Sequence, residues 1–125
     1  MENDKKKFKQ EFKKRIYHWI LRLIKMTGNL SKGSANEVII KQIIRSSTSI
    51  MANYIEADSA ASKKDFINFF TYSLKSANET KFWLTLIKDI NPGCEQEIEY
   101  LTKELIEISN IIAASILTLK DKGKK

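Results

Sequence analysis

Side chains able to do acid–base or nucleophilic chemistry are few in this chain. His18 is the only histidine and Cys94 the only cysteine among 125 residues. The basic residues Lys14 and Arg15 lie one turn before His18, and no second His or Cys completes a metal site or a nucleophile pair. Di-iron helical sites need Glu-x-x-His motifs, and phosphate-binding loops need glycine patterns that this sequence lacks. We therefore expect no catalytic residues, no cofactor and no metal, and a protein that is not an enzyme.

Cationic side chains are concentrated near the N-terminus instead. Residues 1–26 contain nine basic and three acidic residues, a net charge of +6 in a chain whose total is +7. A concentrated basic face attracts polyanions. We predict a nucleic-acid-binding surface, with a solvated face that serves only solubility as the alternative. Its residues are Lys5, Lys6, Lys7, Lys9, Lys13, Lys14, Arg15 and Arg22.

A line of polar side chains runs from Arg45 to Glu56 at spacings of four, four and three residues, which keeps it on one helical face. If segments 34–60 and 63–90 form a hairpin, Arg45 lies level with Glu79, which predicts an ion pair between the two helices. We interpret these residues as a network that specifies the fold, with a small binding site as the alternative. The network comprises Arg45, Ser49, Asn53, Glu56, Asn78 and Glu79.

Helical periodicity and helix-breaking residues predict the helices that position these side chains. We expect four amphipathic helices, and no β-alternation is convincing. Short connections force neighbouring helices to run up and down, so the fold class is all-α, an antiparallel four-helix bundle forming a single domain over residues 1–125. The expected helices span about 4–26, 34–60, 63–90 and 92–121, with a basic tail at 122–125.

Local signals mark where the last three helices begin. The run Ser34 to Glu37 has the S-x-x-E form of a capping box, and Ser62 to Asp65 is a similar start. Asn91 before Pro92 predicts an N-cap followed by proline in the first turn.

Apolar residues at helical spacing identify the expected core. In the first helix they are Phe8, Phe12, Ile16, Trp19, Ile20, Leu23 and Ile24, and in the second they are Ile39, Ile43, Ile50, Tyr54 and Ala57. In the third they are Phe66, Phe69, Tyr72, Trp83 and Ile87, and in the fourth Ile98, Leu101, Leu105, Ile108, Ile112, Ser115 and Leu119. Any aromatic residue left exposed could stack on bases, and the candidates are Trp19, Phe69, Phe70 and Trp83.

A second apolar line in the fourth helix comprises Ile106, Ala113 and Leu117. One core does not need two stripes, so we predict a subunit interface, with scattered surface apolar residues as the alternative. No segment reaches the roughly 20 apolar residues of a membrane span. The unpaired Cys94 fits a reducing compartment, and we expect a cytoplasmic protein.

Two linked signatures carry a family resemblance. The run 44–57 reads I-R-S-S-T-S-I-M-A-N-Y-I-E-A, and the run 74–84 reads L-K-S-A-N-E-T-K-F-W-L. They resemble the 23S ribosomal RNA intervening-sequence protein family of small bacterial four-helix bundles. The matching positions are Arg45, Ser49, Ile50, Asn53, Glu56, Asn78, Glu79 and Trp83, and Asp58 departs from the Gly that members often carry there.

The resemblance implies a four-helix protomer that commonly assembles as a ring-like homopentamer. Relatives include accessory proteins of diversity-generating retroelements, whose basic pentamers are thought to bind nucleic acid and a reverse transcriptase. Two functions follow as hypotheses. One is a non-enzymatic oligomer that binds RNA or DNA, as an accessory to a nucleic-acid enzyme such as a reverse transcriptase. The alternative is a structural or adaptor oligomer that binds a protein partner.

Overall fold

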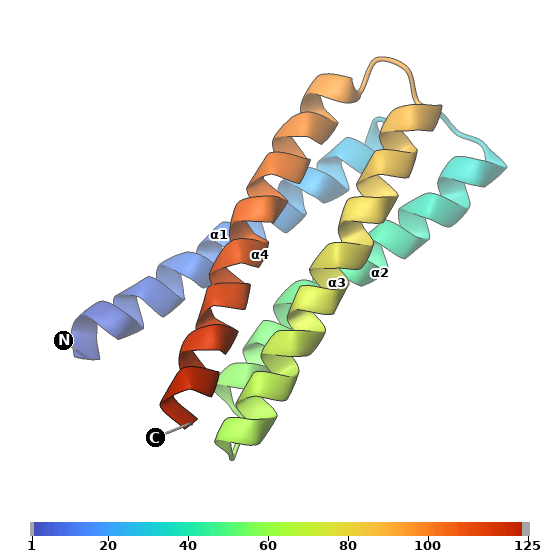
Figure 1. Ribbon diagram of the computed structural model, residues 1–125. Coiled ribbons are helices and arrows are strands. Elements are labelled where there is room, and N and C mark those ends of the chain that lie inside the picture. The colour runs from blue at the N-terminus through green and yellow to red at the C-terminus, as the bar shows by residue number, and fades with distance from the viewer. Residues whose placement is uncertain (1, 124–125) are drawn as a thin grey trace.

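The computed structural model contains four helices that run up and down (Figure 1). They are α1 (Glu2–Gly28), α2 (Ser34–Asp58), α3 (Lys63–Ile90) and α4 (Glu95–Gly123). The structure describes the backbone of residues 2–123 and the side chains of residues 3–121, so the predicted basic tail at 122–125 lies outside the described side chains. The predicted all-α, up-and-down arrangement is confirmed.

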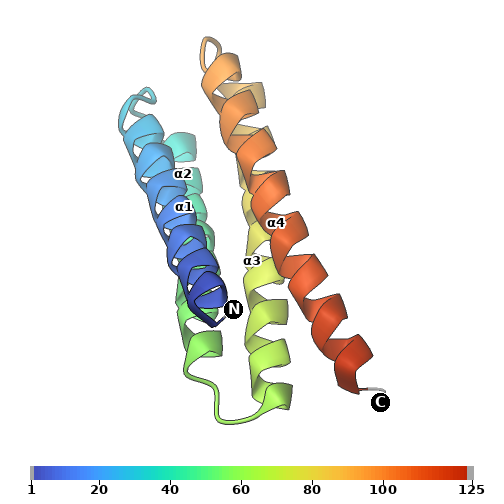
Figure 2. The same ribbon diagram turned by 90° about the vertical axis from the view of Figure 1, so that its left-hand side faces the viewer.

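Each helix packs against two others. Helix α1 packs on α2 and α4, and α3 packs on α2 and α4. Figure 2 shows the N-terminus of α1, the C-terminus of α4 and the α2–α3 turn at the same end of the molecule. The termini therefore flank one end of the core, and the α1–α2 and α3–α4 connections close the other.

The core stripes of α2 and α4 match the periodicity of the sequence. Every residue predicted for α2 is buried, and α4 buries its stripe from Ile98 to Ile112. Beyond that point Ser115 and Leu119 are only half-buried, and Ile116 enters the core instead.

The core prediction for α3 is wrong for Tyr72, whereas its three other predicted aromatic residues pack against the core without being fully buried. Tyr72 is 50% exposed and Phe66, Phe69 and Trp83 are half-buried; only Ile87 lies in the core as expected. The small side chains of Ser73 and Thr80 bond to α2, and the ring of Phe70, one turn earlier, stacks on Tyr54 of α2. The buried residues of α3 are Phe70, Ser73, Ala77, Thr80, Leu84 and Ile87.

Hydroxyl groups at the α2–α3 seam find partners across it. The Ser73 hydroxyl donates to the carbonyl oxygen of Ile50 at 2.8 Å, and the Thr80 hydroxyl donates to the Ser46 hydroxyl at 2.8 Å. A buried polar group that lacked such a bond would destabilise the fold by about 1–3 kcal/mol. No described buried polar side-chain atom is without a partner.

Helix α1 buries a narrower stripe than its sequence predicts. Ile16, Trp19 and Leu23 are buried as expected, and the indole N–H of Trp19 donates to the Leu101 carbonyl oxygen at 2.9 Å. Phe8 is 54% exposed and Ile24 is 38% exposed. Phe8 lies before the first buried turn of α1, which starts at Phe12, and Ile24 lies at the edge of the buried face, beside the buried residues Leu23 and Met26.

The beginning of α2 differs from the predicted capping box. Gly33 is the N-cap, and no side chain caps the helix. The Asn36 side chain instead donates to the Ser31 carbonyl oxygen at 2.8 Å and exchanges hydrogen bonds with the Asn91 side chain. The Ser62 cap is confirmed, since its hydroxyl accepts from the Asp65 backbone N–H.

Helix α4 begins three residues later than predicted. Asn91 is the C-cap of α3, with its side chain held by Asn36 and the Ile87 carbonyl oxygen, and it is therefore unable to cap α4. Gly93 takes a positive φ of 97°, which suits a residue without a side chain and interrupts the helix after proline. Within the described residues, no helix is long and apolar enough to cross a membrane.

Candidate nucleic-acid interface

The eight basic residues predicted to bind nucleic acid divide into two groups on α1. Three of them form ion pairs with acidic residues of other helices: Lys13 with Asp58, Arg15 with Glu104 and Glu107, and Arg22 with Glu97. The other five have no ion pair within the described residues, and all five are exposed. We call these five the α1 lysine cluster: Lys5, Lys6, Lys7, Lys9 and Lys14.

Arg15 joins α1 to α4 through a fork. Its Nε donates to Glu104 Oε2 and its Nη2 donates to Glu104 Oε1, both at 2.7 Å, and Nη2 also donates to Glu107 at 2.9 Å. This hydrogen bonding from Arg15 lowers the pKa of Glu104 and raises the pKa of Arg15. Such paired geometry fixes the guanidinium in place.

Arg22 makes the same kind of contact with α4, about two turns further along α1. Its Nε and Nη2 donate to the two carboxylate oxygens of Glu97 at 2.7 and 2.9 Å, and its guanidinium lies 3.6 Å from the ring centroid of Tyr100. The Arg22 hydrogen bonds lower the pKa of Glu97. Both arginines therefore act first as contacts between α1 and α4, a role that the sequence analysis did not assign to them.

The α1 lysine cluster presents charge in two directions. Lys7 and Lys14 lie seven residues apart on the outward face of α1, about 10 Å along its axis. Lys5 and Lys9 fall instead on the helical face that carries the core residue Ile16. The cluster therefore combines an outward row with a pair on the core-facing side, and Lys6 lies between the two around the helix.

The predicted ion pair between α2 and α3 is present. The guanidinium of Arg45 pairs with Glu79 Oε2, and the Trp83 indole N–H donates to the same oxygen at 2.9 Å. Arg45 also donates to Gln42 at 3.2 Å. The hairpin register inferred from the sequence is therefore correct.

The rest of the predicted polar network is only partly assembled. The Asn53 amide donates to the Ser49 hydroxyl at 3.0 Å, and the Ser76 hydroxyl donates to the same Ser49 oxygen at 3.0 Å. The side chain of Glu56 is exposed and forms no hydrogen bond or ion pair with another described residue. Asn78 is exposed and accepts only from Lys81 at 3.4 Å. Most partners are internal to the seam, which favours the structural interpretation.

The second apolar line of α4 lies largely at the surface. Ile106 is 43% exposed and Leu117 is 62% exposed, whereas Ala113 is half-buried. Apolar side chains on one helix face that are not covered within the chain are available for contact with another molecule.

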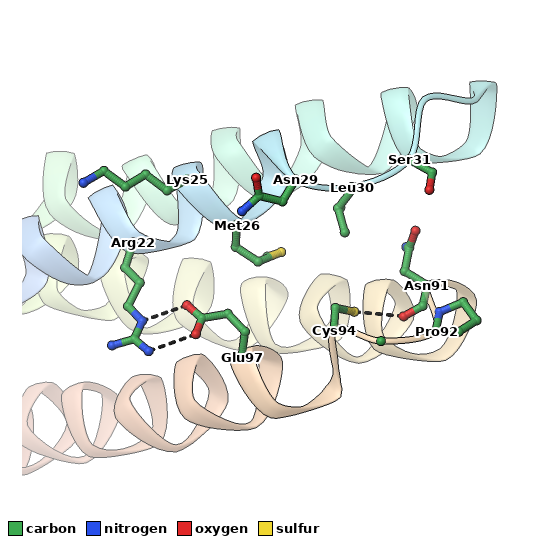
Figure 3. A pocket seen from close by; sticks show the side chains of 11 residues that line it. Arg22, Lys25, Met26, Asn29, Leu30, Ser31, Asn91, Pro92, Cys94 and Glu97 are labelled. Atoms are coloured by element: carbon green, nitrogen blue, oxygen red, sulfur yellow. Dashed lines mark hydrogen bonds and ion pairs between the residues drawn. The ribbon is translucent and has the colours of Figure 1, made fainter.

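The single cysteine lies in a pocket of about 520 Å³ between the two connections at the closed end (Figure 3). The Cys94 thiol donates to the Asn91 carbonyl oxygen at 3.0 Å, and burial raises its pKa. Arg22 at the pocket wall is already paired with Glu97. A raised thiol pKa disfavours the reactive thiolate.

Among the described residues, no group of His, Cys, Asp and Glu is placed to hold a metal ion.

The aromatic residues suggested for base stacking are mostly unavailable. Trp19 and Phe70 are buried, and Trp83 is half-buried with its indole N–H bonded to Glu79. Phe8, which the sequence analysis placed in the core, is the exposed ring beside the lysines. The lysines at core-facing positions around it, Lys5 and Lys9, are the signal that could have identified it.

Known proteins match this chain over most of its length. Residues 9–114 match the protein family described as 23S rRNA-intervening sequence protein. The crystal structure of a protein with unknown function from the S23 ribosomal protein family of Bacteroides thetaiotaomicron VPI-5482 is similar with a TM-score of 0.75. It is 32% identical, and the match covers 86% of this chain and 96% of that chain. No curated protein matches significantly.

Proposed function

We propose that this chain, which belongs to the 23S rRNA-intervening sequence protein family, is not an enzyme and binds the phosphate backbone of RNA or DNA through the α1 lysine cluster. One observation carries the proposal. Lys13, Arg15 and Arg22 are paired with carboxylates of other helices, whereas all five lysines of the α1 lysine cluster are exposed without an ion pair in the described part of the chain. Unpaired lysines gain most from a polyanion, because they lose no internal partner on binding.

The physical basis is release of counterions from the nucleic acid. Each phosphate neutralised by a lysine releases condensed ions, so affinity falls steeply with salt and depends little on base sequence. Five lysines within the first half of α1 are enough for a salt-dependent interaction. We propose that this binding serves a nucleic-acid enzyme, such as a reverse transcriptase, to which the chain is an accessory in the cytoplasm.

Assembly would multiply this surface. We propose a homo-oligomer, a ring-like pentamer as the family resemblance implies, with the exposed apolar line of α4 at the subunit contact. Each chain carries a net charge of +7, so five would present about +35 along one assembly. Several α1 helices on one particle would engage one strand at several points, which strengthens binding without a new kind of contact.

Charge reversal of three lysines of the α1 lysine cluster tests this proposal. Lys6, Lys7 and Lys14 are changed together to Glu, and binding of labelled RNA and DNA is followed by fluorescence anisotropy. The matched control reverses three exposed lysines elsewhere on the molecule, at Lys32, Lys41 and Lys103.

The cluster variant should bind at least tenfold more weakly than the control variant, although both carry the same net charge. Circular dichroism should show both to be folded, since none of the six lysines forms an ion pair in the described structure. Equal losses in the two variants would show that only net charge matters, and the proposed surface would be wrong.

The exposed α4 line supports a second candidate, an adaptor that binds a protein partner. Changing Ile106 and Leu117 to Glu should dissociate an oligomer that uses this face, as light scattering would measure. Changing Ile55, which is 47% exposed on α2, to Glu is the control. An α4 variant that keeps its assembly and its nucleic-acid binding but loses a bound protein would favour the adaptor.

A further inference from the structure

An apolar groove opens at the end of the bundle where α1 begins and α4 ends. Its volume is about 670 Å³, and the helices that border it are α1, α2, α3 and α4. Aromatic and aliphatic side chains form most of its surface, including Phe8, Phe66, Phe70 and Leu119. Small-ligand pockets of about 300–1,000 Å³ commonly have this apolar character.

The aromatic rings of the groove are in contact with one another. Phe8 lies parallel to Phe12 within 14°, and Tyr54 lies against both Phe12 and Phe70. Phe66 meets Phe70 edge-on with ring centroids 4.5 Å apart. Phe8 is the exposed end of this series, so a flat aromatic ligand can stack there without displacing the core.

Lysines border the same groove. Lys5 and Lys9 lie on the face of α1 that is apolar further along the helix, yet both are exposed beside the aromatic surface, with Asp4 as the one acidic neighbour lining the groove. An apolar partner segment would leave these ammonium groups without counter-charges. The pairing of flat rings with flanking cations is complementary to a ligand that has both an aromatic plane and phosphates.

Tyr54 supplies a polar atom at this site. Its side chain is 3% exposed and lines the groove, and its hydroxyl makes no hydrogen bond within the described part of the chain. Every described buried polar atom that solvent cannot reach has a partner, so this hydroxyl is reached from outside. Burial, with a contribution from Asp58, raises the pKa of Tyr54 to about 12, which keeps the hydroxyl protonated as a donor.

We propose that this groove accepts an unpaired base of single-stranded nucleic acid, stacked on Phe8 with its edge toward Tyr54 and its flanking phosphates on Lys5 and Lys9. The inference rests on the proposed function and makes it more specific: single strands bind more tightly than duplexes because only they can place a base in the groove. Stacking of this kind tolerates any base, since every base has a flat face.

The experiment compares three labelled ligands by fluorescence anisotropy: a 12-nucleotide oligothymidylate, an abasic strand of the same length and a 12-base-pair duplex. Phe8→Ala removes the ring, and Tyr17→Ala is the matched control, because Tyr17 is on the same helix and both rings are 54% exposed. Phe8→Trp keeps a stacking surface, and Tyr54→Phe removes only the hydroxyl.

Phe8→Ala should weaken oligothymidylate binding by about fivefold or more, the range of one lost stacking contact. Binding of the abasic strand and the duplex should stay unchanged. Phe8→Trp should retain the wild-type preference, Tyr17→Ala should have no effect, and Tyr54→Phe should give a smaller loss for oligothymidylate alone.

Equal affinity of wild-type protein for the abasic strand and oligothymidylate would overturn the inference while leaving backbone binding intact. Equal losses from Phe8→Ala and Tyr17→Ala would also overturn it. A change of oligomeric state in Phe8→Ala would assign the groove to a second copy of the chain. The variant with Lys6, Lys7 and Lys14 changed to Glu tests the proposed function separately, because it should bind all three ligands more weakly.

Discussion

Arg15 and Lys14 are neighbours on α1 whose roles should separate on mutation. Arg15 is held by Glu104 and Glu107, whereas Lys14 is exposed and has no ion pair among the described residues. Arg15→Gln should therefore destabilise the fold and have little effect on nucleic-acid binding. Lys14→Gln should leave stability unchanged and weaken binding.

The size of the stability effect follows from the geometry. A hydrogen bond to a charged group contributes about 1.5–3 kcal/mol, and Arg15 makes a two-bond fork to Glu104. The Arg15 side chain is 36% exposed and that of Glu104 is 20% exposed, so solvent screening reduces the gain toward the value of a surface pair. We expect Arg15→Gln to lower the free energy of unfolding by about 1 kcal/mol, or the melting temperature by roughly 3–5 °C for a chain of this size.

Thermal unfolding followed by circular dichroism measures this, and a double-mutant cycle with Glu104→Gln isolates the pair. The coupling between Arg15→Gln and Glu104→Gln should be about 0.5–1 kcal/mol. Anisotropy with a labelled single strand measures binding for the same variants. Equal destabilisation by Arg15→Gln and Lys14→Gln, or a binding loss in Arg15→Gln as large as in Lys14→Gln, would refute the division of α1 into paired and available cations.

Three further predictions concern the rest of the fold. The Arg15 hydrogen bonds lower the pKa of Glu104, so this pair stabilises the protein above the ordinary Glu pKa of about 4.3 and is lost as the pH falls through the lowered value. The melting temperature should fall between about pH 5 and pH 3, and less steeply in Arg15→Gln; an identical fall would contradict this. Ala77→Leu should destabilise the protein by about 1–3 kcal/mol in urea unfolding, because Ala77 is fully buried at the α2–α3 seam; unchanged stability would show a looser seam. Burial raises the pKa of Cys94, so iodoacetamide at pH 7.5 should modify it more slowly than an unfolded-chain thiol, and equal rates would show that the pocket does not shield it.

Short-range patterns were enough to predict much of the fold. The buried stripe of α2 and the ion pair between Arg45 and Glu79 followed from helical periodicity and from the register of one hairpin. The residues that join these two helices lie on either side of a single short turn. The short turn therefore fixes the register of α2 against α3.

The aromatic residues of α3 show where periodicity failed. Ring-bearing residues were assigned to the core because they are apolar, but Ser73, Ala77 and Thr80 occupy the seam with α2. Small side chains allow the backbones to approach, and their hydroxyls bond across the seam. Hydrophobicity alone does not reveal which face of a mixed helix contacts its neighbour.

The sequence also could not predict which basic residues of α1 form ion pairs and which remain unpaired. Arg15 and Glu104 are 89 residues apart, and Arg22 and Glu97 are 75 residues apart. Their pairing depends on the register of α1 against α4, which neither helix specifies by itself. Phe8 was placed in the core for the same reason, since its exposure depends on where the bundle ends.

The central claim is that the α1 lysine cluster contacts phosphates. Its most direct test is the salt dependence of single-strand binding from about 50 to 200 mM, in wild-type protein and in the variant with Lys6, Lys7 and Lys14 changed to Glu. Each phosphate contact contributes about 0.7 to the slope of log affinity against log salt. We predict a steep slope for wild-type protein and a slope shallower by about 2 in the variant. A slope that is unchanged in the variant, or near zero in the wild-type protein, would contradict the account.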